Sequence, residues 1–217
     1  MAEQAVSRSA SLPILDLADP NLADRILSLE ASGHPLLLIS SGPVSLEPAS
    51  ALRCLDSLLR RDDPVFGILG ASLRGPAAGL FLACDQILWL PRGSLTFDPG
   101  PLGEAVLLSL RIGPAAANRV WFSGRRLGRR EAVRSGWAES FSGAASLAAA
   151  EARRRLEGIA PAALRLLRPL LLRGHGLPRG PAEALERASF GLLFESGEPA
   201  EGARAFLEKR KPRFGKE

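Results

Sequence analysis

The sequence predicts an α/β protein with a mostly parallel sheet, followed by a helical C-terminal part. Two patterns lead to this fold class. Up to about residue 103, short apolar runs alternate with amphipathic helical segments, which is typical of right-handed βαβ units. Beyond that point Ala, Leu, Arg and Glu recur at helical spacing, and no further strand is expected. A chain of 217 residues can bury one good core, so a single domain suffices.

The expected strands are short and rich in aliphatic residues. The continuous apolar run that follows His34 and Pro35 is typical of a strand buried on both faces of a parallel sheet. Similar runs occur further along the chain. The strands are expected at residues 12–17, 36–40, 65–69, 86–90 and 94–97.

Helices are expected between these strands. Residues 19–33 form the first, which Asn21 could cap, because Asn is favoured at a helix N-terminus. Residues 48–61 carry leucines at 52, 55, 58 and 59, which is the apolar stripe of an amphipathic helix. Residues 75–85 form a glycine-rich turn that leads into a third, apolar helix.

The C-terminal part is expected to be helical throughout. Its predicted helices cover 144–160, 161–172 and 181–196, with a Gly-His-Gly-Leu-Pro break at 174–178. We therefore divide the chain into a flexible tail at 1–10, an α/β core at 11–140 and a helical region at 141–217. No linker separates the last two parts, so they are assigned to the same domain.

Composition narrows the possible functions. The chain has only Cys54 and Cys84, without a Cys/His cluster, so neither a disulfide framework nor a metal site is expected. The N-terminus lacks a secretory signal pattern, and the longest apolar stretch, 75–90, is interrupted by Asp85. A cytoplasmic protein with no membrane segment is expected.

The positive charge does not by itself indicate nucleic-acid binding. The net charge is +5 and the sequence pI is about 10.2, but the basic residues are spread along the chain and are almost all Arg. The three Lys follow residue 208, and there is no Tyr to stack on bases. Nucleic acid is therefore ranked as an unlikely partner.

Two stretches carry a resemblance to a known family. ILGASLRGPAAGLFLACDQILWLPRGSLTF, residues 68–97, is similar to the central segment of the crotonase (enoyl-CoA hydratase/isomerase) superfamily. FESGEPAEGARAFLEKRKPRF, residues 194–214, resembles that family's closing signature. The resemblance implies a crotonase-like ββα spiral whose C-terminal helices mediate a homotrimer or a dimer of trimers. It also implies a CoA thioester as substrate or ligand, with no permanently bound cofactor.

The resemblance also implies where the acyl group would react. Crotonases hold the thioester oxygen between two backbone N–H groups and move protons with carboxylates. Aligned on Ala83-Cys84-Asp85, the family's triple glycine falls on residues 75–77, so Pro76, which has no N–H, stands at the donor position. The two family glutamates fall on Gly79 and Pro99.

Other carboxylates could replace those glutamates. An alignment shifted by one residue makes Asp98 the second carboxylate and Gly75 the oxyanion donor. Glu104 is the other candidate acid. Asp98 also has a structural interpretation, because Asp before Pro-Gly is a common turn former.

The family's CoA-contact positions near the C-terminus are intact. Phe206 and Lys209 match the pair that approaches the nucleotide end of CoA, often from a neighbouring subunit. Lys supplies a point charge for phosphate and Phe supplies apolar cover for adenine. The same helix could be retained for subunit assembly alone.

Three functional hypotheses follow. The first is a crotonase-type protein that binds an acyl-CoA or acyl-carrier thioester with a degenerate catalytic site, and that supports a partner enzyme or acyl-carrier protein in a polyketide-type pathway. The second is an active hydratase, isomerase or decarboxylase that uses Asp98 or Glu104. The third is a basic nucleic-acid-binding protein.

Overall fold

The computed structural model describes residues 12–29, 34–42, 44–100 and 102–214. Its main sheet is parallel throughout, as predicted, with strand order β1-β2-β3-β5-β8. The strands are β1 (Ile14–Asp16), β2 (Leu36–Ser40), β3 (Val65–Leu69), β5 (Gln86–Trp89) and β8 (Ala138–Ser140). Each predicted strand of this sheet lies within a residue or two of its expected position.

A second, smaller sheet contains β4 (Ser72–Arg74), β6 (Ser94–Thr96) and β7 (Leu127–Gly128). Strand β6 is parallel to β4 and antiparallel to β7. The prediction that no strand follows residue 103 is wrong, because both β7 and β8 do. They have two and three residues, and each is defined by a partner far away in the sequence, which a local pattern does not reveal.

One face of the main sheet is covered by α1 (Leu22–Ser28), α2 (Pro48–Arg60) and α3 (Pro76–Leu80), which continues into the 3₁₀ turn Phe81–Ala83. Asn21 does stand at the start of α1, but its side chain makes no capping bond, so that part of the prediction is wrong. Instead its backbone N–H donates to the Asp19 carboxylate at 2.9 Å.

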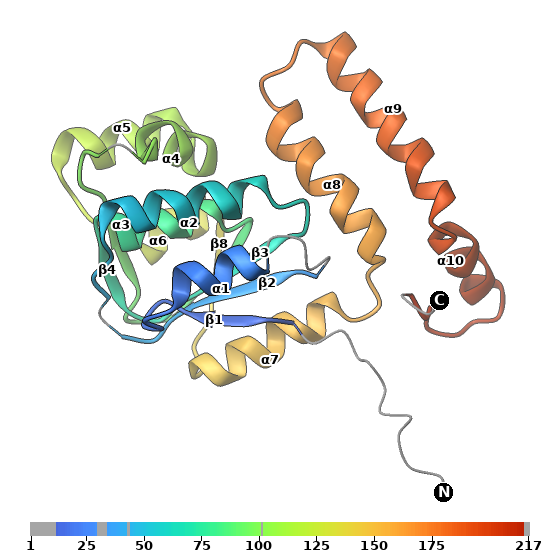
Figure 1. The fold of residues 1–217 in the computed structure, drawn as a ribbon, viewed down its shortest axis with the longest axis horizontal. Helices are drawn as coiled ribbons and strands as arrows, with labels where there is room; N and C mark the ends of the chain where they lie inside the picture. Colours follow the sequence, from blue (N-terminus) through green and yellow to red (C-terminus); the bar gives the residue numbers. More distant parts are fainter. Residues whose placement is uncertain (1–11, 30–33, 43, 101, 215–217) are drawn as a thin grey trace, which may run out of the picture.

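The opposite face is covered by α7 (Ala145–Leu156), as Figure 1 shows. Small alanine side chains at 148, 149 and 152 let this helix pack closely on Leu37, Ile68 and Leu88 of the sheet. The main sheet is therefore buried on both faces, which accounts for the continuous apolar runs of its central strands.

Three helices lie between β6 and β8 in the chain: α4 (Glu104–Ile112), α5 (Pro114–Ser123) and α6 (Arg129–Arg134). Helices α4 and α5 pack against each other, and α6 leads directly into β8. In Figure 1, α4 and α5 lie together at one end of the molecule.

The last three helices are α8 (Pro161–Gly174), α9 (Arg179–Glu195) and α10 (Glu198–Leu207). They extend away from the sheet at the end opposite α4 and α5 (Figure 1). The Glu198 carboxylate caps α8 by accepting the Ala162 N–H at 3.0 Å. Helix α9 has no buried residue. The predicted helices of this region are confirmed.

No helix in the described ranges combines the length and the apolar character that crossing a bilayer requires.

Candidate active site

The turn between β4 and α3 is where the family resemblance places an oxyanion donor. Gly75 occupies the left-handed region there, with φ +56°, and its N–H donates to the Thr96 carbonyl at 2.9 Å. Pro76 is the first residue of α3 and has no N–H. The Gly75 N–H is therefore already engaged, and neither residue presents a free donor.

The Asp98 side chain is held by a cation at the surface. Both carboxylate oxygens accept hydrogen bonds from Arg74, at 3.0 and 2.9 Å. The side chain is 46% exposed. Both oxygens are thus occupied by Arg74 at the surface, so Asp98 does not present a free oxygen to a substrate as a general acid–base must.

Glu104 lies in a different environment. It is the first residue of α4 and only 2% exposed. Its Oε1 atom has no hydrogen-bond partner among the described residues. Burial, and secondarily the negative charge of Asp98, raises the pKa of Glu104 to about 7. A carboxyl group with such a pKa can accept and return a proton near neutral pH, which is the property a general acid–base needs.

The Glu104 carboxylate lies beside Gly79. A Cβ at position 79 would stand 2.7 Å from Glu104 Oε1 and 3.1 Å from Leu102 Cδ1. Gly79 is also where the resemblance places one of the family's glutamates. The Glu104 carboxylate, which belongs to α4, thus occupies the space beside Gly79. A side chain at position 79 would clash with Glu104 in this position.

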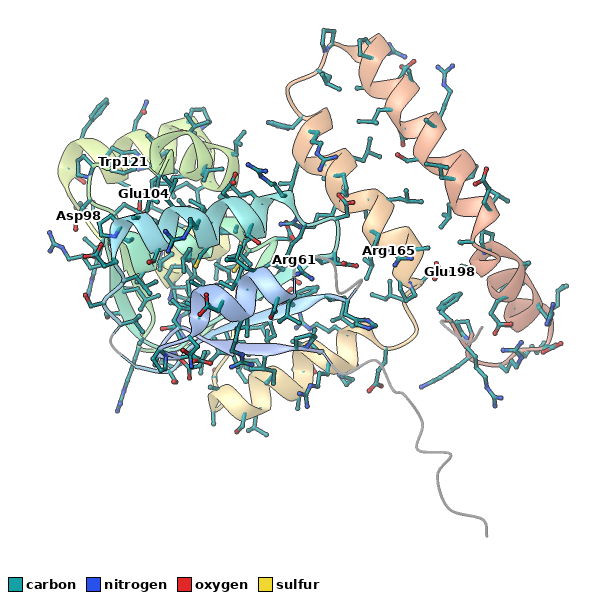
Figure 2. All side chains as sticks on the ribbon, viewed as in Figure 1. Arg61, Asp98, Glu104, Trp121, Arg165 and Glu198 are labelled. Atoms are coloured by element: carbon teal, nitrogen blue, oxygen red, sulfur yellow. The ribbon has the colours of Figure 1, made fainter. Side chains whose placement is uncertain are left out.

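A second unpartnered polar atom belongs to Trp121 on α5. Its indole Nε1 is buried and has no acceptor among the residues described. Its ring packs on Phe97 with centroids 6.1 Å apart. Figure 2 shows Asp98, Glu104 and Trp121 at the same end of the molecule.

The predicted CoA contacts are not brought to this site within one chain. Phe206 is 84% exposed near the end of α10, and Lys209 follows it with φ 53°. Figure 1 places α10 and α4 at opposite ends of the molecule. The acyl part and the nucleotide part of the predicted site therefore lie far apart in a single copy.

Asp85, at the end of the Ala-Cys-Asp motif, has a structural role that the sequence did not reveal. Its Oδ2 atom accepts the Val65 N–H at 2.8 Å and Nε of Arg168 at 2.6 Å. Arg111 lies 3.6 Å from its other oxygen. The preceding Cys84 is fully buried, as is common for a free cysteine, and burial raises the pKa of its thiol.

Comparison with known proteins points to one family. The family described as enoyl-CoA hydratase/isomerase matches residues 97–217. A Thermus thermophilus protein named as an enoyl-CoA hydratase is 33% identical over 156 residues, which are 66% of this chain and 61% of that protein. A Bacillus subtilis protein of the same name is 31% identical over 166 residues, 70% of this chain and 62% of that one. The chain thus spans about three fifths of the length of these curated relatives.

Solved structures show the same fold over nearly the whole chain. An enoyl-CoA hydratase subunit from Geobacillus kaustophilus superposes with a TM-score of 0.79 at 25% identity, covering 93% of each chain. An enoyl-CoA hydratase from Polaromonas sp. has a TM-score of 0.80 at 18% identity, covering 93% of this chain and 95% of that one. The predicted crotonase fold is confirmed, and the chain belongs to the enoyl-CoA hydratase/isomerase family.

Proposed function

We propose that the protein binds an acyl-CoA thioester and uses Glu104 to move a proton at a carbon near the thioester carbonyl. The observation that supports this most is the state of Glu104, which is 2% exposed and has an unpartnered oxygen and a pKa of about 7. Burying a carboxyl group without a partner lowers the stability of the fold, and proteins retain such unfavourable groups mainly at functional sites. The proposal favours the second hypothesis above, with Glu104 rather than Asp98.

The proposed step is a proton abstraction. Ionised Glu104 takes a proton from the substrate carbon; the C–H bond breaks, an O–H bond forms on Glu104, and the electron pair moves onto the thioester oxygen as an enolate. If Glu104 exchanges this proton with solvent before it returns one to the same carbon, the substrate hydrogen is exchanged. In a substrate whose double bond is conjugated with the enolate, return of the proton to the far carbon of that bond moves the double bond. A single carboxylate serves for both halves of the step.

The reaction is expected to be slow for this family. Neither Gly75 nor Pro76 offers an N–H group to the developing oxyanion, and loss of one such donor typically lowers the rate by about 10²–10³. The degenerate-site hypothesis therefore applies to the oxyanion hole, which is weakened, and not to the acid–base group, for which Glu104 is available. If no proton moves, we propose instead that the protein has the auxiliary role, in which it supports a partner enzyme or an acyl-carrier protein.

We further propose that the complete site forms between copies in a homotrimer, in which Phe206 and Lys209 of one copy approach Glu104 of the next. Their position at the far end of the chain from α4 supports this, since one copy alone cannot bring them together (Figure 1). Helix α9 also exposes apolar side chains that a second copy could cover, namely Phe190, Leu192 and Phe194.

The direct test is exchange of substrate hydrogen. Butyryl-CoA is incubated with the protein in D₂O, and deuterium at the carbon next to the carbonyl is followed by mass spectrometry. Glu104→Gln should lower the exchange rate at least a hundredfold, whereas Glu157→Gln, at an exposed carboxylate at the end of α7, should leave it unchanged. Equal rates for the wild type and Glu104→Gln would reject the assignment. CoA binding without any exchange would favour the auxiliary role.

A further inference from the structure

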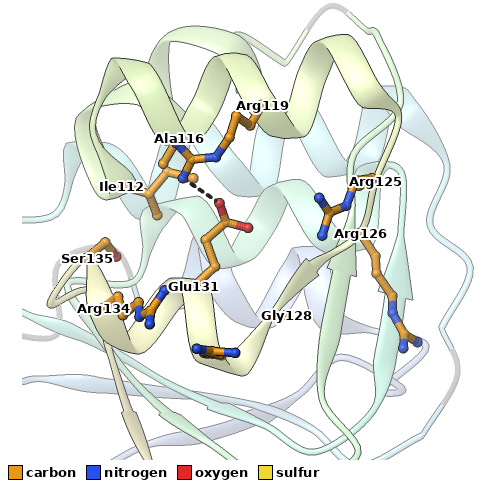
Figure 3. A pocket seen from close by; sticks show the side chains of 10 residues that line it. Ile112, Ala116, Arg119, Arg125, Arg126, Gly128, Glu131, Arg134 and Ser135 are labelled. Atoms are coloured by element: carbon orange, nitrogen blue, oxygen red, sulfur yellow. Dashed lines mark hydrogen bonds and ion pairs between the residues drawn. The ribbon is translucent and has the colours of Figure 1, made fainter.

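A basic pocket lies between α5 and α6, apart from the Glu104 carboxylate. It has a volume of about 820 Å³. One wall is apolar, formed by Ile112 and Ala116, and Figure 3 shows arginine side chains around it. The arginines that line it are Arg119, Arg125, Arg126, Arg130 and Arg134.

The positive charge of this pocket is largely uncompensated. Glu131, the acidic residue in the lining, is engaged by Arg119 at 3.0 Å, the contact drawn in Figure 3. The other four arginines make no hydrogen bond or ion pair through their side chains with any residue that the structure describes. Like charges gathered in this way repel one another, so the arrangement favours an anion that binds them together.

Arginines elsewhere in the chain are more often paired with carboxylates. Arg154 pairs with Glu151 at 2.8 Å, and Arg210 pairs with Glu201 at 2.7 Å. Many surface arginines thus have a carboxylate within reach, whereas four of the five arginines that line the pocket have none among the described residues. Their high number in the sequence does not explain this difference in placement.

We propose that this pocket binds a soluble small molecule that carries two or more phosphate groups. Guanidinium groups match phosphate oxygens through paired hydrogen bonds, and several of them suit several phosphates. The volume lies in the range of about 300–1,000 Å³ typical of small-molecule sites. The apolar wall would cover the organic part of the ligand, and a hollow between helices does not fit a flat bilayer.

This site is separate from the proposed chemistry at Glu104. Ile112 ends the helix that Glu104 begins, which puts them about 12 Å apart along its axis at about 1.5 Å per residue. Binding of a ligand in this pocket can therefore be tested independently of the function proposed for Glu104.

Calorimetry with pyrophosphate as the probe tests the proposal. Pyrophosphate should bind at least tenfold more tightly than inorganic phosphate, and binding should weaken as salt screens the charges. The double variant Arg130→Gln/Arg134→Gln should bind pyrophosphate at least tenfold more weakly. The control is Arg92→Gln/Arg153→Gln, which removes the same charge from exposed positions outside the pocket and should change binding less than twofold.

Three outcomes would overturn the proposal. Pyrophosphate could fail to bind the wild-type protein, or both double variants could lose affinity equally, which would mean that only overall charge matters. A hexaglutamate peptide that binds more tightly than pyrophosphate would assign the surface to an acidic protein instead. Deuterium exchange measured on Arg130→Gln/Arg134→Gln should stay at the wild-type rate, which separates this site from Glu104.

Discussion

At the scale of single residues, the burial of Glu104 has a consequence for stability. Its pKa is about 7 in the folded chain and 4.5 as an ordinary carboxyl, so the unfolded chain releases this proton at lower pH. The stability of the fold is therefore unaffected by this group below about pH 4.5 and falls as the pH rises toward 7. The shift corresponds to at most about 3 kcal/mol.

Replacing Glu104 by Gln should remove this pH-dependent cost. We expect Glu104→Gln to match the wild type in urea unfolding at pH 4.5 and to exceed it by about 1–3 kcal/mol at pH 8, because Gln stays neutral. Urea unfolding at both pH values, with Glu157→Gln as control, measures the difference. An equal effect of Glu104→Gln at both pH values would contradict a raised pKa.

Gly79 offers a test of position rather than charge. An Ala side chain there would meet Glu104 Oε1 at 2.7 Å, but that atom ends a flexible side chain and can move away. Ala is also favoured over Gly within a helix by up to about 1 kcal/mol. The same Cβ would also stand 3.1 Å from Cδ1 of the buried Leu102, which must shift slightly, and this shift offsets part of the gain. Gly79→Ala should therefore change the melting temperature little while deuterium exchange falls at least tenfold.

The control for this variant is Gly191→Ala on α9, where an added Cβ meets nothing within 4 Å. It should share any gain from helix propensity and leave exchange unchanged. If Gly79→Ala exchanges at the wild-type rate, the position of the Glu104 carboxylate does not limit the reaction.

The sequence identified Asp98 and Glu104 as candidates but could not separate them. What distinguishes them is environment: one carboxylate meets Arg74 and water, and the other is buried beside Gly79. The first environment depends on the pairing of β4 with β6 and the second on the packing of α4 beside α3, and both are tertiary contacts. The sequence shows that residue 79 is a glycine without a side chain, but it does not show that Glu104 lies beside it.

At the scale of elements, hydrogen bonds from Arg168 hold α8 against the α/β layers. Arg168 is 3% exposed and donates to the Asp85 carboxylate at 2.6 Å and to the Leu58 carbonyl at 3.1 Å. It also donates to the carbonyl oxygens of Arg61 and Ala83. These bonds join α8 to two separate segments of the core, residues 58–61 and 83–85.

Arg168→Met should therefore destabilise the protein strongly. Removing one partner of a buried pair typically costs about 3–5 kcal/mol. Asp85 would then keep only the longer contact with Arg111 as compensation for its charge. The matched control is Arg173→Met on the same helix, whose 3.5 Å contact with Asp62 is exposed and should be worth less than about 1 kcal/mol. Urea unfolding distinguishes them; similar losses in both variants would show that Arg168 does not fasten α8.

The sequence was informative about elements that carry a local pattern and uninformative about the others. The apolar runs of β2 and β3 and the leucine stripe of α2 were sufficient to place them. Strand β7 has two residues and β8 has three, and each exists because a distant strand offers it hydrogen bonds. Arg168 likewise appeared as one more basic residue in a helix until the fold placed Asp85 beside it.

At the scale of the whole molecule, the shared-site proposal predicts complementation between defective chains. Glu104→Gln and Phe206→Ala/Lys209→Ala should each exchange poorly alone. After the two are unfolded together and refolded, mixed trimers contain some sites with all three native side chains, so part of the activity should return. Light scattering should report a trimer mass. A monomer mass at micromolar concentration, or no recovery from the mixture, would contradict a site shared between copies.

The pH dependence of deuterium exchange tests the central assignment most directly. Because the reaction needs ionised Glu104, the rate with butyryl-CoA should rise through an apparent pKa near 7 and then level off. Asp98→Asn should move this rise to lower pH, since the charge of Asp98 contributes to the raised pKa of Glu104. Glu104→Gln should abolish the rise altogether. A rise near pH 7 that persists in Glu104→Gln would show that another group carries the proton.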